Sequence, residues 1–255
     1  MSWRVSPSRV ATVLTAIALS LTTLSLVGFY AKHVFGHDHI LGFVPLFDID
    51  EEANVPSWFS SVLLLICAGL LWAHARHAQE SSDPHRRGWA GLAGIFLFAS
   101  LDETAAIHER VGALLKGVRG LHPSLYFAWV VPAIALLIVF ALVYARFVFA
   151  LPKPTRVRFI VAGVLYVGGA VGIEMLGGNH ASRYGMKTPG FGLLTHAEEL
   201  CEMLGLVLFI YGLMRSAEER FAEIRVTIES TGVPATQAAA RGSFRPRALS
   251  GAPPS

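Results

Sequence analysis

Long apolar segments alternate with short polar ones along most of the chain, and this pattern predicts membrane-spanning helices. A bilayer core of about 30 Å needs roughly 20 apolar residues in helical form. Six segments reach or approach that length: 10–30, 58–74, 89–109, 125–145, 157–178 and 194–214. The third does so only when its polar second half, LDETAAIHE, is counted inside the membrane. We therefore expect an all-α, polytopic integral membrane protein with a six-span domain over residues 1–214.

The composition supports this class of protein. Of the 255 residues, 53% are hydrophobic and only 15% are charged, whereas soluble domains carry about 25% charged residues. A soluble enzyme, a disordered chain and a nucleic-acid-binding protein are all disfavoured. The net charge of +3 comes from Lys and Arg residues that lie between the apolar segments, where they orient a membrane protein.

The distribution of Lys and Arg predicts the orientation. The N-terminus, the second and fourth loops and the C-terminal tail together hold fifteen of these residues, and the three remaining loops hold six. Because cytoplasmic segments are rich in Lys and Arg, both termini are expected on the cytoplasmic side of the plasma membrane. The first span follows Arg4 and Arg9 and has an alternative interpretation as a cleaved signal peptide, but it is long for one and lacks a clear cleavage site. The tail, 215–255, is predicted to begin with a short amphipathic helix and then to be disordered.

Acidic residues and histidines gather on the opposite, outer side. Twelve of the 18 acidic residues and seven of the ten histidines lie in outer loops or the outer halves of spans. The rule that sorts Lys and Arg is largely indifferent to Asp and Glu, so it does not explain this. An ionised side chain in hydrocarbon costs several kcal/mol unless it is paired or hydrated. We therefore expect spans two, three, five and six to form an inner bundle around these side chains, with spans one and four outside it.

Carboxylates and imidazoles that project inward from several helices are typical of metal sites in helical bundles. Asp102 and Glu109 share a helix face, and His196, Glu199 and Glu202 follow one arc of the last span. The acids that precede Pro56 are explained equally well as caps of the second span. The predicted metal ligands are Glu52, Asp102, His108, Glu109, Glu174, His180, His196, Glu199 and Glu202, with Glu103 and Glu198 as catalytic proton carriers. This set suits a divalent ion such as iron, manganese or zinc.

Familiar catalytic motifs do not narrow the chemistry further. The sequence has no H-E-x-x-H, no G-x-S-x-G and no P-loop, so no nucleotide cofactor is expected. Cys67 and Cys201 lie inside apolar segments, which argues against a thiolate metal site. Trp58, Trp89 and Trp129 lie near span ends, where tryptophan is typical of the membrane interface.

The sequence thus favours a metal-dependent membrane enzyme, either a hydrolase or an oxidase or hydroxylase, that acts on a lipid or another apolar substrate from the outer leaflet. The same acids would serve a proton- or cation-coupled transporter, although carrier sites usually lie near the midplane. A third alternative is a non-catalytic assembly protein whose polar network fixes helix packing. A haem site is a weaker alternative, because it leaves the acids unexplained. The expected partners are membrane lipid and an apolar small molecule, with no nucleic acid.

Overall fold

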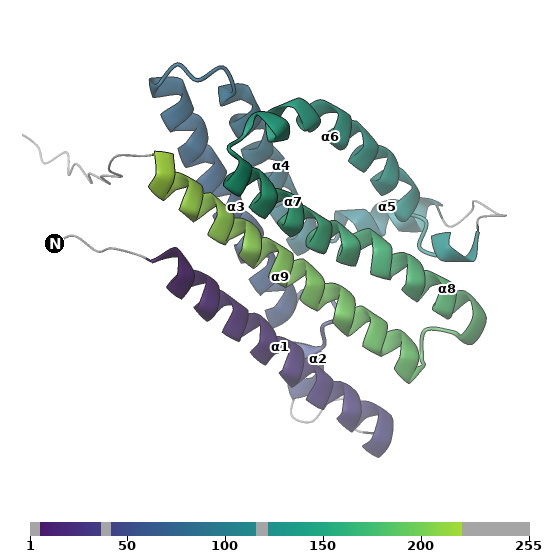
Figure 1. The fold of residues 1–255 in the computed structure, drawn as a ribbon. Helices are drawn as coiled ribbons and strands as arrows, with labels where there is room; N and C mark the ends of the chain where they lie inside the picture. The colour runs from purple at the N-terminus through teal and green to yellow at the C-terminus, as the bar shows by residue number, and fades with distance from the viewer. Residues whose placement is uncertain (1–5, 37–41, 116–121, 221–255) are drawn as a thin grey trace, which may run out of the picture. The chain divides into compact units, whose positions relative to one another are not determined.

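The chain is all-helical over the part that the structure, a computed structural model, describes: residues 6–36, 42–115 and 122–220 (Figure 1). Five helices are long and apolar enough to cross a membrane, and six if one bent pair counts as a single span. The expected helical fold and the number of candidate spans are therefore confirmed. The elements are α1 (Pro7–Phe35), α2 (Phe43–Phe47), α3 (Val55–Glu80), α4 (Arg86–Ala105), α5 (Ile107–Leu115), η2 (Pro123–Leu125), α6 (Val130–Ala150), α7 (Lys153–Val167), the π-helix η3 (Gly168–Ile173), α8 (Glu174–Tyr184) and α9 (Pro189–Arg220).

Helix ends differ from the predicted spans where proline sets the boundary. The fourth span was expected at 125–145, but α6 ends five residues later, at Ala150, just before Pro152. α9 begins at Pro189, and proline is favoured at the first helical position. It continues to Arg220, so residues 215–220 extend the last helix and do not begin a separate one. The predicted tail from 221 onward lies outside the described residues.

The third predicted span, 89–109, is not one straight helix. α4 ends at Ala105, α5 begins at Ile107, and the two helices are bent by 71° relative to each other. The residue between them, Ala106, has a left-handed backbone with φ of 48°. The Asp102 carboxylate accepts a hydrogen bond of 2.8 Å from the His108 backbone N–H. Such side-chain acceptors compete with the helical backbone pattern, which gives a physical reason for the break.

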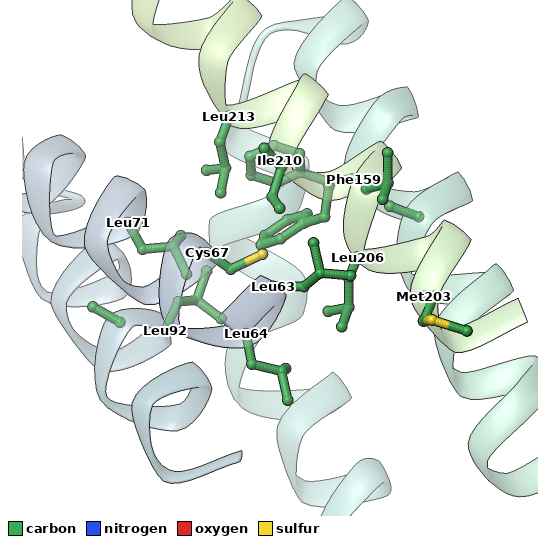
Figure 2. Close-up of a cluster of buried hydrophobic side chains, with 14 of the residues drawn as sticks. Leu63, Leu64, Cys67, Leu71, Leu92, Phe159, Met203, Leu206, Ile210 and Leu213 are labelled. Carbon is green, nitrogen blue, oxygen red and sulfur yellow. The ribbon is translucent and has the colours of Figure 1, made fainter. Parts of the chain in front are cut away.

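The core lies between α3, α4, α7 and α9 (Figure 2). Leu63 and Leu71 of α3 and Ile210 and Leu213 of α9 have no exposed surface. Leu92 from α4 and Phe159 from α7 complete the same cluster. Burying each such side chain contributes about 1.5–3 kcal/mol in water; in a lipid environment the benefit comes from close packing instead.

The first and fourth spans differ in how they meet this core. Many large side chains of α6 are exposed, including Leu136 at 69% and Leu142 at 75%, which suits contact with lipid. By contrast, α1 packs along α9 and buries Ala18, Leu21 and Ser25. Span one thus packs one face on α9 and leaves large side chains such as Val13 and Tyr30 exposed, and the absence of charged residues within it does not prevent this packing.

A polar contact fixes α3 against α4 near the acidic residues. The Ser61 hydroxyl donates to the Ser100 carbonyl oxygen, and the Ser100 hydroxyl donates to the Ser61 carbonyl oxygen, both at 2.9 Å. Thr104 joins them, with its hydroxyl 2.8 Å from that of Ser61. The reciprocal bonds hold the C-terminal half of α4 in a defined register, and thereby position Asp102 and Glu103.

Close approach of α7 and α9 depends on Gly205. A Cβ atom at this position would lie 2.7 Å from the backbone N of Tyr166, and backbone does not move aside cheaply. We expect Gly205→Ala to lower the free energy of unfolding by about 1–3 kcal/mol, measured as a lower melting temperature in detergent. Gly163 on α7 has open space around its Cβ position, so Gly163→Ala should not destabilise. Equal effects of both variants would contradict the proposed contact.

Candidate functional site

A cavity of about 1310 Å³ lies among α4, α5, α6, η3, α8 and α9. Its volume exceeds the roughly 300–1,000 Å³ typical of small-molecule sites. Nine of the eleven residues predicted from sequence line it: Glu52, Asp102, Glu103, His108, Glu109, Glu174, Glu198, Glu199 and Glu202. Side chains from the third, fifth and sixth predicted spans, and from the loop that leads into the second, therefore line the same cavity.

The loop before α3 carries Glu52 and two further acids, Asp50 and Glu51, to the cavity. Asn54 caps α3 by accepting a hydrogen bond from the Ser57 backbone N–H at 3.1 Å. Its side-chain amide donates to the carbonyl oxygens of Asp48 and Glu51, at 2.5 and 2.6 Å. One residue thus starts the helix and folds the acidic loop over its end.

Burial affects the carboxyl groups of this loop. It raises the pKa of Asp50 to about 6, and the neighbouring charges of Asp48 and Glu51 act in the same direction. Burial also raises the pKa of Glu52 above its ordinary value; the charge of His108 opposes the rise, and Glu109 adds to it. One oxygen of Glu52, Oε2, is out of contact with solvent and has no hydrogen-bond partner among the described residues. The cavity therefore contains an acceptor with unused capacity.

Asp102 orients His108 across the break between α4 and α5. The His108 ring donates from Nδ1 to Asp102 Oδ2 at 3.1 Å, and its backbone N–H donates to Asp102 Oδ1 at 2.8 Å. Both carboxylate oxygens are therefore occupied by one residue. Within the described chain the other ring nitrogen, Nε2, has no hydrogen-bond partner. An imidazole held in this way is prepared to bind a metal ion or to accept a proton through Nε2.

Glu174 is held by an aromatic residue that the sequence suggested as an interfacial anchor. The Trp129 indole N–H donates to Glu174 Oε1 at 2.9 Å. The same indole meets the His108 ring edge to face, with centroids 5.2 Å apart. Trp129 therefore links the carboxylate at the start of α8 to the Asp102–His108 pair.

The acids of α9 approach the cavity because η3 packs closely on that helix. A Cβ atom at Gly169 would lie 2.8 Å from the Glu198 carbonyl oxygen and 3.0 Å from Cγ of Glu202. Only glycine allows this approach. The charges of Glu103, Glu52 and Asp50 act on Glu199, which places this carboxylate in electrostatic reach of two other segments, α4 and the loop before α3.

Neither His180 nor His196 lines the cavity, and both expectations are corrected. His196 is buried against α1: its Nδ1–H donates to the Gly192 carbonyl at 2.7 Å, and Nε2 accepts from the Ser25 hydroxyl at 2.9 Å. Ser25 in turn accepts from the Ile49 backbone N–H at 2.9 Å. The side chains of His196, Glu199 and Glu202 spread around part of the circumference of α9. This spread is wide enough for His196 to face α1 while the two glutamates face the cavity. His180 pairs with Thr188, Nε2 to Oγ1 at 2.8 Å.

Several lining residues were not selected from the sequence. A capping role explained Asp50 and Glu51 equally well in the sequence, Trp129 was expected only as an interfacial anchor, and Tyr126 and Tyr166 were not singled out. The three tryptophans expected at the membrane interface differ in their exposure. Trp58 is 65% exposed, whereas Trp89 is fully buried and stacks on His74. Aromatic residues at span ends carry no signal that distinguishes an interfacial anchor from a side chain in a cavity.

The described residues contain no group of three or more His, Cys, Asp or Glu side chains arranged to hold one metal ion. The acids share a cavity but do not converge on a single point. In this arrangement the site is an acidic space with one oriented imidazole.

The fold and cavity define the class: an all-helical protein with five or six helices able to span a membrane and an acidic cavity between them. Residues 10–217 match a family described as a domain of unknown function (DUF8692). This match covers most of the chain, which therefore belongs to that family. No curated protein and no solved structure matches the chain.

The Ser25 hydroxyl connects α1, α9 and the acidic loop, so its removal should be costly. Ser25→Ala leaves His196 Nε2 without its donor and the Ile49 N–H without its acceptor, and we expect a loss of about 1–3 kcal/mol in the free energy of unfolding. Ser20 lies on the same helix, exposed, with its hydroxyl bonded to the Ala16 carbonyl. Ser20→Ala is the matched control and should unfold like the wild type. An unchanged melting temperature in Ser25→Ala would contradict the stabilising role of these hydrogen bonds.

Proposed function

We propose that this protein spans the cytoplasmic membrane six times, with α4 and α5 together forming the third span and both termini in the cytoplasm. The helix lengths support the number of spans, and the excess of Lys and Arg in alternate loops supports the orientation. In this orientation the acidic cavity lies in the outer half of the bilayer and opens toward the outer side.

We further propose that the cavity is the active site of a metal-dependent membrane enzyme that acts on a lipid or another apolar substrate. The observation that carries this proposal is the Asp102–His108 pair, which fixes one imidazole in a cavity lined by carboxylates. Metal-bound histidines commonly donate their second ring N–H to a carboxylate in this way. A bound divalent ion would supply activation of water, or of dioxygen in an oxidase or hydroxylase.

The donor set fits such an ion by its chemistry. Carboxylate oxygens with one imidazole suit iron, manganese or zinc. His108 would bind through Nε2, and Glu109, Glu174, Glu199, Glu202 and Glu52 are the candidate carboxylate ligands. Because no three of these side chains converge in the structure, the proposal requires at least two carboxylates to swing toward His108 when the ion enters.

The remaining acids have different tasks in this proposal. Asp102 has both oxygens bonded to His108, so it orients the ligand and is no longer a good candidate ligand itself. Glu103 and Glu198 line the same cavity without a hydrogen-bond partner in the described chain. We propose that these two carboxylates accept and release protons during turnover.

Metal analysis of the full chain purified in detergent tests the proposal. The wild type should contain stoichiometric iron, manganese or zinc. Glu199→Ala should lose the ion, and Asp102→Asn should weaken its affinity roughly 10–100-fold, because an unoriented imidazole is a poorer ligand. Glu218 pairs with Arg215 at the opposite end of α9, so Glu218→Ala is the matched control and should retain metal. Equal metal content in all four proteins would exclude the cavity as the metal site.

A cation carrier is the second candidate, and two backbone features favour it. The break between α4 and α5 and the π-helix η3 both border the acidic cavity. Interrupted helices form the ion sites of many transporters, and π-helical turns are frequent at functional sites. Metal-free protein that moves protons or cations across liposomes would replace the enzyme with this carrier. Metal-free protein without transport would contradict both proposals.

A further inference from the structure

α4 and α6 approach each other closely at one end. Near the cytoplasmic side, a Cβ atom at Gly88 would collide with the Phe147 ring, and one at Gly91 would collide with the Tyr144 hydroxyl. The Trp89 and Phe147 rings also meet there edge to face, with centroids 5.0 Å apart. These small residues on α4 and aromatic rings on α6 close the space between the two helices at this end.

Toward the outer side the same two helices border the cavity. Ala99 of α4 lies about 12 Å beyond Gly91 along the helix, and it lines the cavity together with Ala133 and Leu137 of α6. Above them α5 crosses toward the start of α6, where a Cβ atom at Gly112 would lie 3.4 Å from Cβ of Trp129. The cavity therefore has a side facing between α4 and α6, bounded by Tyr144 below and by the Gly112–Trp129 contact above. We call this side the α4–α6 window.

The window leads from an apolar surface to an acidic interior. Phe98 and Leu101 of α4 and Leu136 of α6 are exposed beside it, as side chains in contact with lipid tails are. Inside, ten carboxylates line the cavity: Asp50, Glu51, Glu52, Asp102, Glu103, Glu109, Glu174, Glu198, Glu199 and Glu202. Arg110 is the one Lys or Arg among the described lining residues.

The interior is suited to a cationic head group. The buried Glu52 Oε2 atom lacks a hydrogen-bond partner in the described part of the chain, and an ammonium group could supply up to three donors. Tyr126 and Trp129 line the same space, and aromatic faces attract ammonium groups. A phosphate or carboxylate head would instead face ten acidic side chains, which among the described lining residues are opposed by Arg110 and two histidines.

We propose that a long-chain amphiphile with a protonated amine head, and without phosphate or carboxylate, enters the cavity from the outer leaflet through the α4–α6 window. Its tail lies between α4 and α6 beside Ala99, Ala133 and Leu137, and its head reaches the carboxylates. This inference names the substrate class of the proposed site and rests on the proposal that the cavity is functional. It does not depend on which reaction takes place there.

Photolabelling of the full chain in neutral phosphatidylcholine vesicles at pH 7 tests the inference. The probes are hexadecylamine, hexadecanol and hexadecanoic acid with the same photoreactive group in the chain. An alkyl amine stays protonated at this pH. Labelling of peptides that contain Ala99 and Leu137 should be about tenfold stronger for the amine than for the other two probes, the ratio that one charge-assisted hydrogen bond supports.

Variants separate the window from the head-group site. Ala99→Trp and Ala133→Trp should block the window and lower amine labelling, while Leu136→Trp, which alters a lipid-facing neighbour, should not. Glu199→Gln with Glu202→Gln should reduce the preference for the amine and leave the labelling by hexadecanol unchanged. Melting temperatures of all variants show whether each one is folded.

Two results would overturn the inference: equal labelling by the three probes, or labelling that the Ala99→Trp and Ala133→Trp variants leave at the wild-type level. Its failure is distinguishable from that of the proposed enzyme. Amine labelling in metal-free protein would support the window and remove the metal chemistry. Stoichiometric metal in protein that shows no preference for the amine probe would support the metal site and contradict the proposed amine substrate.

Discussion

The cost of placing carboxylates among apolar helices is the constraint on which the rest of this structure depends. A charge between helices must be hydrated, paired or hydrogen-bonded, and ten acidic side chains satisfy this requirement by lining one shared cavity. Local polar contacts then hold the surrounding elements: Asn54 folds the acidic loop, Asp102 holds the start of α5, and Trp129 supports Glu174. The fold near the cavity follows from satisfying these groups, while the opposite half is an ordinary apolar core.

Much of the fold follows from the sequence because long apolar segments leave few alternatives. The positions of Asp102, Glu174, Glu199 and Glu202 around one cavity could also be anticipated, since depth along a helix is simple arithmetic at 1.5 Å per residue. Direction around the helix was less predictable. His196 lies one turn from Glu199, yet it faces Ser25 of α1, because the side-chain arc of a helix covers more than one neighbour.

The break at Ala106 and the role of Trp129 were beyond the sequence for another reason. Both depend on bonds that exist only after folding: His108 with Asp102 across the bend, and the indole with Glu174 across 45 positions of chain. A polar segment such as LDETAAIHE indicates that the apolar pattern of the span is interrupted, but it does not indicate where the chain turns. Pairings between distant residues are set by tertiary packing and leave no periodic trace.

The π-helical turn at η3 has a consequence for how this chain would respond to changes in its length. A wide turn holds an additional residue, so every position from Glu174 to Tyr184 is rotated by about 100° relative to an uninterrupted α-helix. That rotation decides which side of α8 is presented to the interior. Gly168 and Gly172 have free space where a side chain would be, so larger residues fit there, whereas deletion of one residue would turn Glu174 away. In this chain, the number of residues in this stretch therefore constrains the orientation of Glu174 more strictly than the identity of residues 168 and 172 does.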